Sequence, residues 1–414
     1  MMPMKAYFDP RLISMIFLGI ACGLPSFLTV STLNCRLGEA GISMSWIGLF
    51  SLISLPHGLK FLIGPLVDRV PLPFLSDYFG RRRSWILFTQ IIMMIGIVGL
   101  GLSSPKENLL MVVFWGLIVS SCSAFDHISM TSYRVEILSK DQQILGSNFT
   151  IVGYRIGNLI SGAGALVLAS YFSWEIAYCF IACCGLIGVI TILMSSEPPL
   201  SVKDTVSLKS TLLSFLDFIK MDKIFWILFF VISFRLGDHL ISGFSNNFYE
   251  SIGFSKIEIA NIIKIYGIIP TILGGIVGGM VTIRIGIRKS LLVFGTLEAI
   301  SPLLYLLQFY TGKNFEILYF TITLGQLTTG MAASIFMTYI AYLCSNTNIT
   351  ATRYSQLSSI KSLGGVCVAA LSGVIIDLQG WPIFFIICTF VSLPCLFMLI
   401  KMQDDFPLSL DYKK

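Results

Sequence analysis

The feature that most restricts the class of this 414-residue sequence is its shortage of charge. Only 12% of the residues are charged, whereas 55% are apolar. Soluble domains carry roughly 25% charged residues, so this composition excludes an ordinary soluble chain. The net charge of +6 does not indicate a nucleic-acid partner, because membrane proteins are basic wherever their loops face the cytoplasm. The sequence therefore predicts a polytopic membrane protein.

The sequence also lacks the patterns that disulfide frameworks, metal centres and enzymes require. Its ten cysteines are scattered, mostly inside apolar runs, and none forms a CxxC motif. Such cysteines are typical of small packing residues. The sequence has no glycine-rich phosphate loop, no HExxH and no ordered Ser/His/Asp motif. We therefore expect no catalytic residue, no metal and no cofactor.

Apolar runs long enough to cross a bilayer recur along the whole chain. About twenty apolar residues match the hydrocarbon thickness, so these runs predict an all-α membrane protein with about twelve transmembrane helices. The runs lie at 12–33, 46–66, 84–103, 109–133, 147–171, 174–194, 224–248, 257–281, 290–309, 315–343, 353–376 and 381–400. The first run has no clear small-residue cleavage site, so we expect it to be a retained span.

One long polar connector divides these runs into six plus six. The predicted domains are an N-terminal six-helix bundle at 1–194, a cytoplasmic linker at 195–223, a C-terminal six-helix bundle at 224–400 and a cytoplasmic tail at 401–414. Lys and Arg gather in the loops on the side of the termini and the linker, and the other side has only four: Arg36, Lys106, Lys256 and Lys313. This bias predicts that both termini lie in the cytoplasm.

The loop between the second and third runs has a partial copy in the second half. The first copy, a predicted gating loop, comprises Gly64, Asp68, Arg69, Gly80, Arg81, Arg82 and Arg83. We expect Gly64 to allow two helix ends to approach closely, Asp68 to pair with a neighbouring segment and the arginines to hold the loop on one side. The second copy comprises Gly279, Arg284, Gly286, Arg288 and Lys289, with Ile283 in place of the acid. This repeat resembles the major facilitator superfamily, whose halves rock about a site near the bilayer midplane.

Eleven acidic, basic and histidine side chains lie away from the ends of the predicted spans: Lys60, Arg155, Arg235, Lys264, Lys361, Asp126, Asp238, Glu298, His57, His127 and His239. Each charge at mid-membrane costs about 2.5–3.5 kcal/mol on insertion scales, so such residues usually face a cavity or pair with one another. Two interpretations remain open: the charges serve transport, or they form ion pairs between helices that only fix packing.

Two helices carry the candidate proton sites. In the fourth, Ser123, Asp126, Met130 and Tyr133 form one stripe with His127 beside it. An acid beside a histidine in an apolar span can exchange a proton near neutral pH. In the seventh, Asp238 is predicted to align with Ser242, Ser245 and Tyr249. Arg235, three residues before Asp238, either neutralises it or meets the solute.

Several other polar side chains in the spans suit a solute. Arg155, Asn158 and Gly162 are predicted to share one face, and small glycines on that helix and on the eighth favour close helix packing. Lys264 lies just before the glycines of the eighth helix, and Gln326 and Gln356 lie on the tenth and eleventh.

The sequence resembles the AmpG muropeptide permeases of Gram-negative bacteria over nearly its whole length. The motifs that carry the resemblance are LGIACGLPSFLTVSTL, IGLFSLISLPHGLKFLIGPLVDR with GRRRSW, YRVEIL, GYRIGNLISGAGALVLA, RLGD, NIIKIYGI, TATRYSQLSSI and GWPIFF. The residues that match the family pattern are Lys60, Asp68, Arg69, Tyr154, Arg155, Asp238 and Lys264. The fourth helix departs from it, because Asp126, His127 and Thr131 stand where the family has Gln, Asp and Asp.

The resemblance implies proton-driven import of 1,6-anhydro-muropeptides across the bacterial inner membrane during cell-wall recycling, by a carrier that is not an enzyme. We expect Asp126 with His127, or Asp238, to carry the proton. Solute binding is expected at Lys60, Tyr154, Arg155, Arg235, Lys264, Gln326 and Gln356. The expected partners are the muropeptide and the lipid bilayer, with no nucleic acid and a monomeric carrier. The alternatives are an AmpG-like carrier of another amphiphilic sugar or acyl conjugate, a polytopic transferase using His127 or His239, and a transport-dead receptor.

Overall fold

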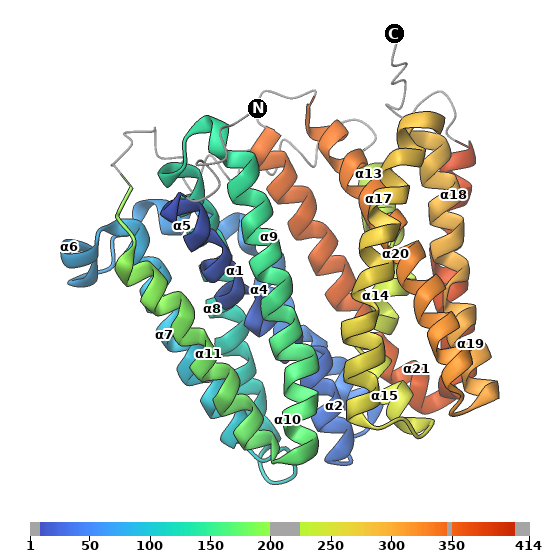
Figure 1. Ribbon diagram of the computed structural model, residues 1–414. Helices are drawn as coiled ribbons and strands as arrows, with labels where there is room; N and C mark the ends of the chain where they lie inside the picture. Colours follow the sequence, from blue (N-terminus) through green and yellow to red (C-terminus); the bar gives the residue numbers. More distant parts are fainter. Residues whose placement is uncertain (1–8, 199–223, 346–349, 402–414) are drawn as a thin grey trace. The chain divides into compact units, whose positions relative to one another are not determined.

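The computed structural model describes residues 9–198, 224–345 and 350–401, and it leaves out the side chains of residues 140, 144, 224, 341–356 and 401. All regular elements in the described ranges are helical (Figure 1). Contacts group the chain into two compact units, one of Met1–Ile42 and Ile53–Ser214 and the other of Ser43–Leu52 and Phe215–Lys414. Most of the predicted linker (199–223) and tail (402–414) lies outside the described residues.

The first unit begins with α1, whose first turn is capped by the Asp9 carboxylate accepting a hydrogen bond from the Arg11 amide at 2.9 Å. Its helices are α1 (Pro10–Leu28), α2 (Ser31–Glu39), α4 (Leu55–Gly58), α5 (Lys60–Arg69), α6 (Leu75–Phe79), α7 (Arg81–Leu102), α8 (Leu109–Ile137), α9 (Gln143–Leu159), the π-helical η4 (Ile160–Gly164), α10 (Ala165–Tyr171) and α11 (Trp174–Met194), with the short 3₁₀ turn η3 (Lys140–Gln142) before α9.

The second unit includes one short segment from the N-terminal half of the chain, Ser43–Leu52, which we call the insertion. Its helices are α3 (Met44–Phe50), α13 (Ile224–Ser233), α14 (Leu236–Ser242), α15 (Ser245–Ser251), α16 (Lys256–Glu258), the π-helical η5 (Ile259–Tyr266), α17 (Ile268–Ile285), α18 (Ile287–Ile300), α19 (Pro302–Thr311), α20 (Phe315–Ser345) and α21 (Thr350–Lys401). The 3₁₀ turn η2 (Ser51–Ser54) joins α3 to α4 at the boundary of the units.

The number of spans agrees with the sequence prediction. The described residues hold ten helices long and apolar enough to cross a membrane, or eleven if the bent pair Met44–Gly58 and Lys60–Arg69 is one span. The last of them is 44 residues long and breaks at Gly380, which has a φ of 76°. When its two arms are taken separately, the total is the predicted twelve.

Several predicted spans are not single continuous α-helices. The run 46–66 bends by 43° between Gly58 and Lys60. The run 224–248 is interrupted after Ser233 and again at Gly243. The predicted alignment of Asp238 with Ser245 and Tyr249 along one helix is therefore wrong, because α14 ends at Ser242 and α15 starts anew at Ser245.

Glycines set the closest helix contacts in each unit, as the sequence predicted. A Cβ on Gly153 or Gly157 of α9 would collide with the backbone of α1. A Cβ on Gly274 of α17 would collide with the backbone of α20, and Gly278 meets the same helix at Met331. Backbone contact at this distance requires a residue without a side chain.

Candidate functional site

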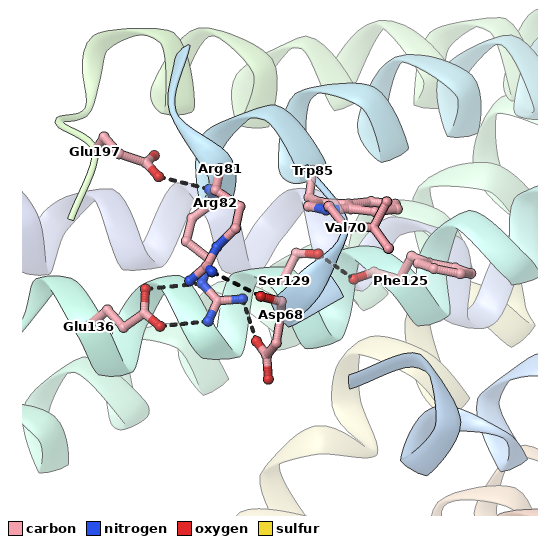
Figure 2. Close-up of polar contacts among 9 residues, drawn as sticks. All are labelled: Asp68, Val70, Arg81, Arg82, Trp85, Phe125, Ser129, Glu136 and Glu197. Carbon is pink, nitrogen blue, oxygen red and sulfur yellow. Dashed lines mark hydrogen bonds and ion pairs between the residues drawn. The ribbon is translucent and has the colours of Figure 1, made fainter. Parts of the chain in front are cut away.

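The predicted gating loop forms an ion-pair network around Arg82 (Figure 2). The Arg82 side chain donates to the Asp68 carboxylate at 2.6 Å and to both oxygens of Glu136 at 2.5 and 3.0 Å. Arg82 is 5% exposed and the Glu136 side chain is 16% exposed, so water screens this pair poorly, whereas the Asp68 side chain is 42% exposed. The predicted pairing of Asp68 with a neighbouring segment is therefore seen, and the partner Glu136 on α8 extends it.

Glu197, just beyond α11, completes this network at the start of α7. Its carboxylate accepts a hydrogen bond from the backbone N–H of Arg82 at 2.8 Å (Figure 2) and another from the backbone N–H of Arg83 at 3.0 Å. N–H groups in the first turn of a helix have no acceptor within the helix, and a negative charge is favoured there. Gly80 precedes them with a φ of 80°, and a Cβ there would collide with Glu197. The glycine therefore supplies both the backbone conformation and the space that this contact needs.

The remaining residues of the loop hold the ends of neighbouring helices. Arg81 donates to the Asp68 carbonyl at 2.8 Å, and Arg83 donates to the carbonyls of Ile192 and Leu193 at the end of α11. Arg69 ends α5. The close approach expected at Gly64 is not found, because a Cβ there would meet no heavy atom of the described residues within 4 Å.

The second copy of the loop keeps part of this arrangement in the second unit. Gly286 precedes α18 with a φ of 81°, close to that of Gly80 before α7. Arg288 donates to the Leu399 carbonyl at 3.3 Å, as Arg83 does to the end of α11. Ile283 is 85% exposed and offers no charge in place of Asp68.

Asp126 lies inside the first unit on the predicted stripe of α8. Ser123, Asp126, Met130 and Tyr133 are each at most 3% exposed, so the stripe faces the interior of the unit. The Thr89 hydroxyl approaches Asp126 Oδ1 at 3.4 Å, whereas Oδ2 has no hydrogen-bond partner among the described residues. The groups next to this carboxylate are Thr89, Gln90 and Cys22, and none of them is a cation.

His127, next in sequence, is exposed and lies in a different environment. It is within electrostatic range of Lys60, His57 and Arg134. Lys60 begins α5 and is half-buried. The predicted solute-binding Lys60 therefore lies near His127. Asp126 is instead buried in the interior of the unit.

The predicted solute-binding residues of α9 also have different surroundings. The Tyr154 hydroxyl lies 2.6 Å from the Ser26 hydroxyl of α1. Arg155 is exposed, while Asn158 and Gly162 are buried, so the predicted common face is not seen. The π-helical stretch η4 follows Leu159 and includes Gly162, which shifts the spacing of side chains along this helix.

A second charged cluster lies in the second unit at the start of α14. Arg235 donates to the Asp238 carboxylate at 2.5 Å, and Arg235 Nε lies 3.6 Å from Glu298 Oε1 of α18. The neutralising role considered for Arg235 is therefore seen. Lys361 of α21 and His239 lie within electrostatic range of Asp238 and Arg235.

The other predicted residues of the second unit are placed as follows. Lys264 lies in η5, a π-helical stretch of a kind often found at functional sites. Gln326 of α20 accepts a hydrogen bond from the Thr271 hydroxyl of α17 at 2.9 Å. Gln356 belongs to α21 but lies outside the side chains that the structure describes.

The insertion α3 is anchored within the second unit by Asp377 of α21. This carboxylate accepts hydrogen bonds from the Ser45 amide at 2.7 Å, the Ser45 hydroxyl at 2.6 Å and the Met44 amide at 3.2 Å. It therefore caps the first turn of α3. Gly48 and Gly373 permit backbone contact beside it.

Sequence reasoning did not assign Glu136, Glu197 or Asp377 to the site, and it noted Glu298 without giving it a role. Glu136 follows Arg134 in the YRVEIL motif, which was a usable signal. Glu197 and Asp377 lie close to helix ends and act on the start of another helix. No local spacing rule connects them to their partners.

Comparison with known proteins places these features in a family. The family profile described as Major Facilitator Superfamily matches residues 15–260 and 234–411. A Rickettsia conorii protein that bears the name transporter AmpG 4 is 33% identical, over 96% of this chain and 98% of its own. The anhydromuropeptide permease of Escherichia coli K12 is 30% identical, over 97% of this chain and 81% of its own.

Solved structures share the fold at low sequence identity. The nucleoside transporter NupG has a TM-score of 0.73 at 16% identity and covers 96% of this chain and all of its own. The D-xylose-proton symporter has a TM-score of 0.68 at 13% identity, over 94% of this chain and 95% of its own. The two-bundle fold class predicted from the sequence is confirmed by these similarities.

Proposed function

The chain belongs to the Major Facilitator Superfamily and, within it, to the AmpG transporters, and we propose that it imports 1,6-anhydro-muropeptides with protons. It is a multi-pass protein of the inner membrane, and both termini are proposed to lie in the cytoplasm. The proposed substrate is GlcNAc-anhydroMurNAc with or without a stem peptide. Its import returns cell-wall fragments to the cytoplasm for reuse.

The observation that carries this proposal is the similarity to the anhydromuropeptide permease, which extends over nearly the whole chain. The cationic side chains in the spans support it, since muropeptides carry carboxylates. Lys60, Arg155, Arg235 and Lys264 are proposed to meet these carboxylates, and Tyr154, Gln326 and Gln356 to bind polar groups of the sugar. The loop around Asp68 and Arg82 is proposed to steady the cytoplasmic gate.

The proton has two proposed positions, Asp126 with His127 in the first unit and Asp238 in the second. Asp126 has neutral neighbours, so protonating it leaves the pairing of nearby charges unchanged. Asp238 lies among Arg235, Lys361 and Glu298, where one proton alters which ion pairs form. This difference favours the cluster of the second unit as the coupling site.

The proposal is tested by uptake of labelled GlcNAc-anhydroMurNAc in cells that lack their own permease. Expression of this protein is expected to restore accumulation, and a protonophore is expected to abolish it. No uptake above the permease-null strain would contradict the substrate, while uptake that persists with the protonophore would contradict the coupling.

The altered α8 favours one second candidate, an AmpG-like carrier of another amphiphilic sugar or acyl conjugate. His127 and Thr131 replace the acids of the family pattern, and His127 is exposed beside Lys60. Competition by unlabelled conjugates distinguishes the two substrates. The muropeptide proposal predicts that unlabelled GlcNAc-anhydroMurNAc is the most effective competitor.

A further inference from the structure

Glu298 of α18 is a buried acid whose charge is poorly compensated. It is 3% exposed, and neither carboxylate oxygen has a hydrogen-bond partner of good geometry among the described residues. The cation paired with it is Arg235, whose Nε lies 3.6 Å from Oε1. A carboxylate in a membrane span is costly unless a cation compensates it, so Glu298 depends on this long contact with Arg235 for compensation.

Arg235 is shared between two carboxylates. Its Nη2 lies 2.5 Å from Asp238 Oδ2, whereas its Nε lies 3.6 Å from Glu298 Oε1, so the pair with Asp238 is the closer one. One guanidinium carries one positive charge, so it neutralises one of the two acids at a time.

Among the groups around the pair, Lys361 brings positive charge near Asp238. Lys361 of α21 and His239 of α14 are within electrostatic range of Asp238, and the Lys361 ammonium also lies over the Phe336 ring at 4.8 Å. Thr329 of α20 lies next to Glu298 and brings no positive charge. Asp238 is also the more accessible acid, with a side chain 28% exposed against 2% for Glu298.

We propose that Glu298 binds the transported proton and that Arg235 changes partner as the proton enters and leaves. When a proton from the outer side binds a Glu298 oxygen, the acid becomes neutral and Arg235 pairs with Asp238. When that O–H bond breaks and the proton leaves toward the cytoplasm, Glu298 regains its charge and competes for Arg235. Arg235 stays charged throughout, so the only species gained and lost is the proton.

This inference rests on the proposed function only for its transport readout. In vesicles containing the full chain, E298Q is expected to lower accumulation of labelled GlcNAc-anhydroMurNAc driven by a pH gradient by about tenfold or more, because the amide cannot release a proton. Exchange of labelled for unlabelled solute at equal pH on both sides is expected to persist within about twofold, since it needs no proton cycle. E316Q makes the same change at an exposed glutamate in the first turn of α20; it is the control and is expected to keep both activities.

A second measurement does not depend on the substrate. In infrared spectra of the purified protein, E298Q is expected to remove a component of the protonated-carboxyl band that the E316Q control keeps. E298D retains an acid and is expected to keep gradient-driven accumulation with an altered pH profile. This variant distinguishes loss of the carboxyl group from misfolding caused by any substitution at position 298. If wild-type vesicles do not transport the muropeptide, the proposed function fails while the infrared test still decides on Glu298.

Three results would overturn the inference. One is wild-type accumulation in E298Q, and another is an unchanged carboxyl band in that variant. The third is loss of gradient-driven accumulation in D126N with E298Q unaffected, which would return the proton to Asp126.

Discussion

Arg82 and Arg235 are each bound to two acids, but their surroundings differ. Arg82 makes hydrogen bonds to both Asp68 and Glu136, so its charge is fully engaged. Arg235 makes a close pair with Asp238 and only a longer contact with Glu298. The first arrangement is typical of a structural ion-pair network, whereas the second allows Arg235 to change its partner.

The two partners of Arg82 are expected to differ in their contribution to stability. Glu136 is 16% exposed, and E136Q is expected to lower the free energy of unfolding by on the order of 3 kcal/mol, because it unbalances a buried pair. Asp68 is 42% exposed, so water screens it and D68N is expected to cost below about 1 kcal/mol. Denaturation of the detergent-solubilised variants measures both. Equal losses, or a larger loss for D68N, would contradict the assignment of Glu136 as the main partner.

Sequence reasoning could reach only some of these residue contacts. The pairing of Arg235 with Asp238 was accessible because the residues are three positions apart on one stretch. Glu298 lies on another helix, and its distance from Arg235 depends on how α14 and α18 pack. Hydropathy reports that a charge lies in a span but not which neighbour it faces.

At the scale of helices, interruptions place the charged residues. Arg235 stands in the break between α13 and α14, and Lys60 begins α5 after the bend at Gly58. Lys264 lies in the π-helical η5. Apolar patterning predicted these spans correctly but missed their breaks, because a broken span and a straight one have the same hydropathy.

Adjacent glycines on α17 test the role of close packing. G274A is expected to destabilise the protein by about 1–3 kcal/mol, since its Cβ would collide with the Leu327 carbonyl of α20. G275A is the matched control, because its Cβ would lie 3.9 Å from the Gly330 carbonyl, and alanine favours the helix by about 0.5–1 kcal/mol. Thermal unfolding of both variants provides the measurement. A stable G274A would show that α17 and α20 can move apart without cost.

At the scale of the whole chain, the two halves repeat one helix junction. Gly80 and Gly286 share a left-handed backbone, and Arg83 and Arg288 each bind carbonyls at the end of the last helix of their half. The repeat and the span count were readable from sequence, as was the family resemblance. The acid network was not retained, since Ile283 stands in place of Asp68.

The central claim is that solute and proton enter together. It is tested most directly in vesicles that hold the wild-type protein and a trapped pH-sensitive dye, with no imposed gradient. Addition of GlcNAc-anhydroMurNAc outside is expected to acidify the interior as the solute enters. Entry of labelled solute without any change in internal pH would contradict the account.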